Sequence, residues 1–206
     1  MKTTSILFTL LISFGLTAQL PKSLDEVAPF HEGLAAIRVG DEWAFIDDLG
    51  NLIIDFRDDI HWNRGAKASD DGVMAVNYPR FSDGRCMVKK EIDGITYYGF
   101  IDTKGKLIIE HDFLNVRPFE NGYTTGIWFE KVFRGQNEFK LNIYEFKFYE
   151  VLMDVDGNIL DFMNRRYNIQ LKKSRYKLPK IESKLLNSNL ITFKKDGAWE
   201  LKKLEL

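Results

Sequence analysis

One pattern of residues occurs twice in this chain of 206 residues, and the repetition constrains the fold more than any other feature. The first copy lies in residues 30–54 and the second in residues 81–109. In each copy, a phenylalanine precedes a glycine by three residues. Further on, an aromatic residue, a small residue, phenylalanine, isoleucine and aspartate follow one another, and glycine comes three residues after the aspartate. Such self-similarity predicts a repeat array, in which recurring residues make turns and core while surface residues set the ligand.

Each copy contains short β-type runs, such as Leu52–Ile54, separated by glycine, aspartate and asparagine. This pattern is typical of antiparallel strands joined by tight turns, so the predicted fold class is all-β. The spacing Asp-x-x-Gly occurs at Asp47, Asp102 and Asp154. Aspartate suits the first position of a type I turn and glycine the fourth, where φ becomes positive, so we expect these aspartates to form turns.

The spacing Phe-x-x-Gly begins at Phe30, Phe81 and Phe119. Each glycine indicates a second turn in its copy. We expect the three phenylalanines to fill the seams between neighbouring copies.

Taken together, this pattern resembles the WG repeat family of exported bacterial proteins over residues 30 to about 122. The Trp-Gly pair of the family corresponds to Trp43-Ala44 and Tyr98-Gly99 here. The resemblance implies a β-rich repeat scaffold with no established catalytic residues. We expect a solenoid-like repeat array of short antiparallel β-meanders. A propeller-like closed β-repeat is the alternative, although copy spacings of 51 and 38 residues are too uneven for identical blades.

The expected organisation is a signal peptide followed by one β-repeat domain over residues 19–206. Its expected parts are copies near 30–60, 71–116 and 119–160, an inserted aromatic hairpin at 126–152 within the third copy, and a degenerate C-terminal copy at 188–206.

The first 18 residues have the features of a secretory signal peptide. Met1-Lys2 supplies the charge, Ile6–Leu16 the short apolar run, and Thr17-Ala18 the small-residue exit. We therefore expect cleavage near Ala18 and export to the periplasm or the extracellular space. With Cys86 as its one cysteine, the exported chain can form no internal disulfide.

The net charge of -1 conceals an asymmetry along the chain. Residues 161–206 contain 12 lysines and arginines against 5 aspartates and glutamates, a net charge of +7. This basic part could contact an anionic envelope surface, such as lipid head groups or acidic polysaccharide; alternatively, it is a solvated edge of the fold. Nucleic acid is not an expected partner of an exported protein.

Residues 128–149 contain 8 aromatic residues. Arg134–Asn137 is the expected turn of a hairpin here, and a change of alternation between Ile143 and Tyr144 predicts a bulge. The hairpin is either a contact surface for an unknown protein or polysaccharide partner, or part of the core. Trp62 carries the same ambiguity. The candidate contact residues are Trp62, Trp128, Phe129, Tyr144, Phe146 and Tyr149.

No local motif indicates catalysis, a cofactor or a metal. His31, His61 and His111 share no metal-ligand spacing with one another or with Cys86. The favoured function is a non-catalytic, exported binding module. The alternatives are an envelope-associated structural protein held by its basic C-terminal part, and a secreted hydrolase whose carboxylates come from distant positions.

Overall fold

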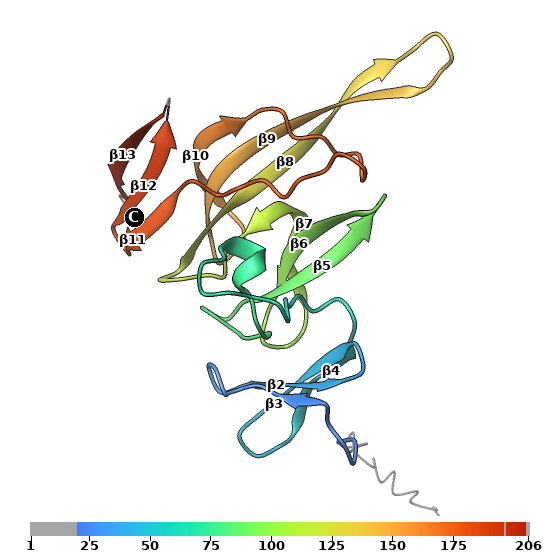
Figure 1. Cartoon of the computed structure of the whole chain (residues 1–206), viewed down its shortest axis with the longest axis vertical. Coiled ribbons are helices and arrows are strands. Elements are labelled where there is room, and N and C mark those ends of the chain that lie inside the picture. Colours follow the sequence, from blue (N-terminus) through green and yellow to red (C-terminus); the bar gives the residue numbers. More distant parts are fainter. Residues whose placement is uncertain (1–19, 196, 205–206) are drawn as a thin grey trace, which may run out of the picture.

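The computed structural model describes residues 20–195 and 197–204, so the predicted signal peptide at residues 1–18 lies outside the described residues. The fold is all-β, with three antiparallel sheets, which confirms the predicted fold class (Figure 1). One short 3-10 helix, η1 (Gly72–Ala75), accompanies the strands. Within the described part of the chain there is no apolar helix of membrane-spanning length.

Neighbouring strands in each sheet follow one another along the chain. The N-terminal sheet has the order β1 (Glu26–Val27), β2 (Ala35–Val39), β3 (Glu42–Ile46) and β4 (Leu52–Arg57). The central sheet contains β5 (Cys86–Ile92), β6 (Ile95–Ile101), β7 (Leu107–Val116), β8 (Tyr123–Gln136), β9 (Asn142–Asp154) and β10 (Ile159–Arg166). The C-terminal sheet has the order β11 (Lys184–Asn187), β12 (Leu190–Lys195) and β13 (Ala198–Lys203).

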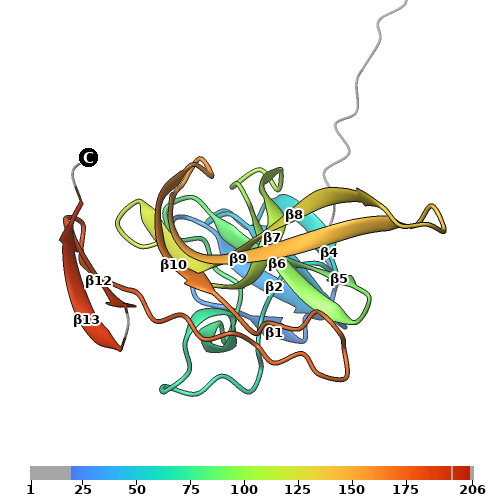
Figure 2. The same cartoon turned by 90° about the horizontal axis from the view of Figure 1, so that it is seen from above.

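The N-terminal and C-terminal sheets lie far apart on the molecule. The N-terminal sheet occupies one end of the long axis, the central sheet lies above it, and the C-terminal sheet lies at one side (Figure 1). The outer part of the β8–β9 hairpin extends to the other side, as the view from above also shows (Figure 2). Over the described residues, the sheets close into neither a barrel nor a propeller.

The Asp-x-x-Gly turns form as predicted. The Oδ1 atom of Asp47 accepts hydrogen bonds from the backbone amides of Leu49 (3.0 Å) and Asn51 (2.7 Å). Gly50 has a φ of 81°, the left-handed conformation that glycine adopts at low cost. The carboxylates of Asp102 and Asp154 accept from the equivalent amides two and four residues further on. Local side-chain chemistry therefore determines these three turns.

The hairpin turn predicted at Arg134–Asn137 was wrong by three residues. The turn lies at residues 137–141, because the side-chain oxygen of Asn137 accepts from the amides of Phe139 (3.0 Å) and Leu141 (2.9 Å). This arrangement matches the aspartate turns, with asparagine in place of aspartate. Lys140 takes the left-handed position of the glycine, with a φ of 59°.

A bulge lies at the predicted level of the hairpin, but on β8 rather than on the strand of Ile143 and Tyr144. The register of β8 and β9 shifts between the pairs Phe133–Tyr144 and Gly135–Ile143. The extra residue is Arg134 on β8, opposite the step from Ile143 to Tyr144 where the alternation changes.

The three Phe-x-x-Gly segments form two-residue turns with positive φ at both central positions. These central pairs are Glu32-Gly33, Asp83-Gly84 and Asn121-Gly122. Positive φ at both positions defines a type I′ turn, whose twist matches that of the flanking strands. In each turn, the residue after the phenylalanine and the residue after the glycine exchange backbone hydrogen bonds.

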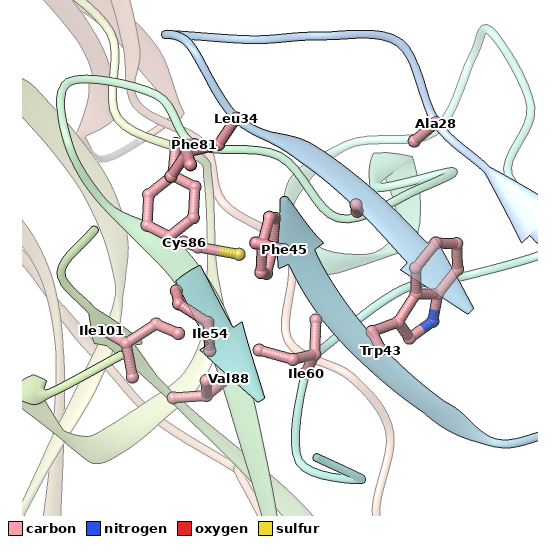
Figure 3. Packing of buried hydrophobic residues seen from close by; sticks show 11 residues of the cluster. Ala28, Leu34, Trp43, Phe45, Ile54, Ile60, Phe81, Cys86, Val88 and Ile101 are labelled. Carbon is pink, nitrogen blue, oxygen red and sulfur yellow. The ribbon is translucent and has the colours of Figure 1, made fainter. Parts of the chain in front are cut away.

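Phe81 and Phe119 fill the seams between copies, as predicted. Phe81 packs edge-to-face on Phe45 of the first copy, with ring centroids 4.8 Å apart (Figure 3). Phe119 packs in the same way on Phe100, which occupies the position of Phe45 in the second copy, at 4.9 Å. Both phenylalanines are buried. The prediction was wrong for Phe30, which is 52% exposed, because no described copy precedes it and covers it.

A glycine–isoleucine contact also recurs at both seams. A Cβ atom placed on Gly105 would lie 3.1 Å from Cγ2 of Ile54 in the preceding copy. A Cβ atom on Gly157 would lie 3.2 Å from Cγ1 of Ile109, the equivalent isoleucine of the second copy. The glycine of each turn thus allows close approach as well as positive φ.

Carboxylates also connect successive type I′ turns. Glu32 accepts hydrogen bonds from the amides of Asp83 (2.7 Å) and Gly84 (2.8 Å) in the second turn. Asp83 in turn accepts from the amide of Gly122 in the third turn, at 2.7 Å. Each acidic residue therefore compensates an amide that the left-handed turn of the next copy leaves without a strand partner.

The third copy differs from the first mainly in the length of its first two strands. Strands β8 and β9 have 14 and 13 residues, whereas β2 and β3 have 5 each. Residues 126–152, expected as an inserted hairpin, thus lie within two continuous strands and their turn. Residues 71–76, expected to open the second copy, contain η1 and no strand.

Candidate functional site

The strongest candidate for a contact surface is the outer part of the β8–β9 hairpin, residues 129–147, which we call the arm. Strand β7 pairs with β8 only up to Trp128, and β10 pairs with β9 only from Phe148 onward. Beyond these points the two strands pair only with each other. The backbone N–H and C=O groups along both outer edges of the arm therefore have no strand partner among the described residues.

The arm has two chemically different faces. Directly paired residues of antiparallel strands share a face, and the faces alternate along each strand. One face, which we call the aromatic face, carries Phe129, Lys131, Phe133, Tyr144 and Phe146. The opposite, charged face carries Glu130, Val132, Arg134, Glu145 and Lys147.

The aromatic face becomes more exposed from the base of the arm toward its tip. At the base, Phe129 lies 5.1 Å from the ring of Tyr97 and packs against a buried cluster. Further out, Phe146 is 38% exposed, Tyr144 is 41% exposed and Phe133 is 56% exposed. Within the exposed part, Phe133 and Tyr144 meet edge-to-face at 5.6 Å. The ammonium group of Lys131 lies 4.2 Å from the centroid of the Tyr144 ring, a cation–π contact.

The charged face consists of ion pairs across the two strands. Glu130 lies 3.5 Å from Lys147, and the Nε atom of Arg134 donates to Glu145 at 2.8 Å. Arg165 of β10 approaches Glu145 to 3.8 Å. The hydrogen bond from Arg134 holds the pKa of the Glu145 carboxyl below its ordinary value. The charges on this face therefore compensate one another within the molecule.

The six residues predicted as contacts do not form one site. Phe129, Tyr144 and Phe146 lie together on the aromatic face. Trp128 and Tyr149 form a pair on the opposite side of the hairpin, where they are partly buried against the second core cluster.

Trp62 lies in a different part of the molecule. It meets Trp43 edge-to-face at 5.4 Å and packs against the first core cluster. The guanidinium group of Arg38 lies over its ring at 5.2 Å. Trp62 therefore contributes to packing near the N-terminal sheet rather than to the arm.

Sequence reasoning missed two members of the aromatic face. Phe133 is its most exposed ring, and Lys131 is its cation. The alternation along β8 contained the signal, because Phe129, Lys131 and Phe133 are two residues apart and so share a face. The turn was predicted three residues too early, so Arg134 and its neighbours were not assigned to the strand. The alternation along β8 was therefore not recognised as one continuous face.

A second candidate is a cavity of about 150 Å³ beneath the segment that contains η1. Its walls include His61, Asp71, Cys86, Phe100 and Arg117. Asp71 and Arg117 form a two-point ion pair at 2.6 and 2.5 Å, so their charges are already compensated. Burial raises the pKa of the Cys86 thiol to about 12 and lowers the pKa of His61 to about 4. Near neutral pH the cavity thus contains a thiol and a neutral imidazole.

The described residues include no group of three or more histidine, cysteine, aspartate or glutamate side chains suited to holding a metal ion.

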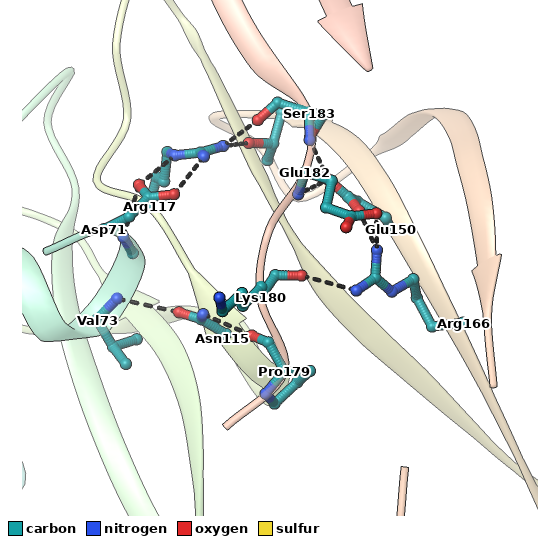
Figure 4. A network of polar contacts seen from close by, with 12 residues as sticks. Asp71, Val73, Asn115, Arg117, Glu150, Arg166, Pro179, Lys180, Glu182 and Ser183 are labelled. Atoms are coloured by element: carbon teal, nitrogen blue, oxygen red, sulfur yellow. Dashed lines mark hydrogen bonds and ion pairs between the residues drawn. The ribbon is translucent and has the colours of Figure 1, made fainter. Parts of the chain in front are cut away.

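A buried polar network attaches two irregular segments to the central sheet (Figure 4). The fully buried carboxylate of Glu150 accepts from the amides of Glu182 and Ser183 and lies 3.2 Å from Arg166. Arg117 joins Asp71 to the backbone oxygen of Ser183.

Asn115 connects the same two segments. Its amide group donates to the backbone oxygen of Pro179 at 2.8 Å, and its oxygen accepts from the amide of Val73 at 3.1 Å. The η1 segment and the coil before β11 are therefore held on the sheet that supports the arm.

Sequence reasoning also missed Glu150 as a structural residue. It lies four residues before Asp154, as Trp43 lies four residues before Asp47 and Tyr98 four before Asp102. A carboxylate thus occupies the position that is aromatic in the first two copies. No local motif indicates this role, because its two backbone donors lie more than 30 residues away in the chain and Arg166 lies 16 residues away.

The burial of His61 predicts a pH-dependent stability. The ring hydrogen-bonds the backbone oxygen of Val73 at 2.7 Å, and its pKa falls from 6.5 to about 4 on folding. As the pH falls, the unfolded chain takes up this proton first. The stabilisation is therefore complete above pH 6.5 and is lost as the pH falls toward 4, by about 3 kcal/mol in total. Urea unfolding at several pH values should show a smaller loss over this window for His61→Gln than for the unchanged chain. Equal losses would contradict the assignment.

Comparison with known protein families identifies the repeats. The family model described as WG containing repeat matches residues 20–43 and 98–125. The second match includes both Phe100 and Phe119, the ring pair of the second seam. The chain matches no curated protein and no solved structure. The chain therefore carries WG containing repeats at two places, which confirms the resemblance to the WG repeat family.

Proposed function

We propose that this protein is a non-catalytic binding module in which WG repeats form an open, solenoid-like stack and the arm contacts a partner protein. The observation that carries the proposal is the aromatic face of the arm, where Phe133, Tyr144 and Phe146 are exposed beside Lys131. Exposed aromatic residues that lie together on one face are uncommon outside interaction surfaces.

The equivalent contacts at the two seams support the solenoid-like stack. The second seam repeats three contacts of the first seam. These are a phenylalanine pair, a glycine–isoleucine contact, and a hydrogen bond from a backbone amide of one turn to the carboxylate of the preceding turn. Repetition of the same contacts from one copy to the next is the defining feature of stacked repeats.

The arm suits a partner that is itself an extended strand. Among the described residues no strand pairs with either outer edge of the arm, and an extended peptide can add to such an edge through main-chain hydrogen bonds. Alternate side chains of that peptide would meet the aromatic face. The charge of Lys131 favours a peptide with apolar residues and an acidic residue nearby.

The arrangement of the rings favours a protein partner over a polysaccharide. Stacking on a sugar ring needs a flat, accessible ring face. Here Phe133 and Tyr144 are inclined to each other by 60°, and Lys131 occupies one face of Tyr144. The side chains that could bind sugar hydroxyls are few on this face, because the charged residues of the arm's two strands lie on the other face, with the exception of Lys131.

Photo-crosslinking in cells that produce the protein tests this proposal. Tyr144→benzoylphenylalanine places the reactive group on the exposed aromatic face, and Leu49→benzoylphenylalanine places it on an exposed turn of the N-terminal sheet. We expect one discrete protein adduct from position 144 and none from position 49. Adding Phe133→Ser should remove the adduct with only a small change in the free energy of unfolding, because more than half of this ring is exposed.

Two results would contradict the proposal. The first is that position 144 yields no adduct. The second is that its adduct resists protease and is removed by a glycosidase, which would identify a polysaccharide partner.

The basic coil between β10 and β11 supports a second contact, with an anionic envelope surface. Lys172, Lys173, Arg175, Lys177 and Lys180 lie within it, and Arg175 and Lys177 line an open groove of about 550 Å³. This contact requires export, for which the pattern of residues 1–18 is the support.

Cell fractionation tests this second contact. The chain should begin at Gln19 in the exported fraction, and a high-salt wash should release it from envelopes, because salt screens exposed charges. Retention after the wash would argue against an electrostatic contact, and an intact leader would argue against cleavage.

A further inference from the structure

The C-terminal sheet repeats the pairing of the first copy, but the described residues leave one of its faces uncovered. In the first copy, Trp43 pairs with Arg38 and Phe45 pairs with Ala36. In the C-terminal sheet, Trp199 pairs with Lys194 and Leu201 pairs with Thr192, in the same register. The β12–β13 hairpin is thus the structural equivalent of the β2–β3 hairpin.

The equivalent side chains differ completely in burial. Trp43 and Phe45 are fully buried, whereas Trp199 is 64% exposed and Leu201 is 63% exposed. The other face of the C-terminal sheet is covered, since Ile191 and Phe193 pack against Leu152, Met163 and Leu204. The sheet is therefore attached to the body by one face, and the face with Trp199 and Leu201 has no partner among the described residues.

The inner seams show what covers this face elsewhere. Phe45 is covered by Phe81, and Phe100 is covered by Phe119. In both cases the covering ring begins the Phe-x-x-Gly turn of the following copy. The face of Trp199 and Leu201 has no following copy among the described residues.

The opposite end of the chain exposes the complementary part. Phe30 begins the first Phe-x-x-Gly turn and is exposed, because the described residues provide no preceding copy on which it could pack. Val27, three residues earlier, is also exposed. The first copy thus exposes a phenylalanine turn. The C-terminal sheet exposes a face of the kind on which such a turn packs at the inner seams.

The charges of the two ends are also complementary. Residues 20–60 contain 3 lysines and arginines against 10 aspartates and glutamates, whereas residues 161–206 contain 12 against 5. Opposite charge at two surfaces favours their encounter and opposes the contact of like ends.

We propose that two copies of this chain associate head to tail, with the Phe30 turn of one copy packed on the Trp199 and Leu201 face of the other. The two ends lie apart on the molecule, so one chain cannot make both halves of the contact with itself (Figures 1 and 2). A contact between two different surfaces is heterologous, and each association leaves one free end of each kind. The occupant of the bare face is therefore a second copy, and further copies extend the row.

Sedimentation velocity of the purified chain over a range of concentrations tests the proposal. The unchanged chain should show species that grow with concentration and that dissociate at high salt. Phe30→Asp disables the head and Trp199→Asp disables the tail, so each variant alone should remain monomeric at concentrations at which the unchanged chain associates. An equimolar mixture of the two should form a dimer and nothing larger, because one intact head meets one intact tail. Each single change should weaken association by about tenfold or more.

Ile92→Asp is the matched control, since Ile92 is an exposed apolar residue of the central sheet and lies outside residues 20–60 and 161–206. It should associate as the unchanged chain does. The proposal is overturned if the unchanged chain stays monomeric up to millimolar concentration, or if the mixture of head and tail variants remains monomeric. Equal weakening by the control would also overturn it, because the effect would then be unspecific. Circular dichroism of each variant verifies that it is folded.

Discussion

The contact on which the rest of the structure depends is the edge-to-face packing of one phenylalanine on the phenylalanine of the preceding copy. A single repeat unit cannot bury its hydrophobic face alone, so each copy needs its neighbour. Phe81 on Phe45 and Phe119 on Phe100 supply this contact and bury large rings at both seams. At the first copy, where the described residues provide no preceding copy, the corresponding ring of Phe30 is exposed. Burial of these rings is therefore a property of the array and not of a single copy.

The turns bring the copies close enough for this packing. Glycine at positions 105 and 157 leaves room for the isoleucine of the preceding copy, where a Cβ atom would be crowded. The acidic residues Glu32 and Asp83 accept the amides of the next turn. These turn residues therefore also determine how closely neighbouring copies approach each other.

The third copy keeps the turns of the first two copies but differs from them in two respects. Its first two strands extend into the arm, which carries the exposed aromatic face. Glu150 replaces the aromatic residue of the earlier copies and attaches the coil at Glu182 and Ser183. A buried carboxylate is stable here because two amides and Arg166 compensate its charge. The repeat thus tolerates a polar residue at a core position when the surroundings satisfy it.

Features that depend on residues close together in the chain could be predicted from the sequence, whereas features that depend on distant residues could not. The aspartate turns were predictable because every hydrogen bond in them lies within four residues. The turn at Asn137 was missed because asparagine and lysine replace the usual aspartate and glycine. The exposure of Phe30 and the partners of Glu150 depend on residues distant in the chain, so no local pattern indicates them. The alternation of side chains along β8 and β9 could have assigned residues to the two faces of the arm. It could not show which face packs against the rest of the molecule.

The most direct test of this account is a double-mutant cycle at each seam. The free energy of unfolding would be measured in urea for Phe45→Leu, Phe81→Leu and the double variant, and likewise for Phe100 and Phe119. Equivalent seams predict a favourable coupling of about 0.5–1.5 kcal/mol at both, the range for edge-to-face aromatic pairs. Strictly additive effects at either seam would contradict the claim that the same ring contact joins successive copies.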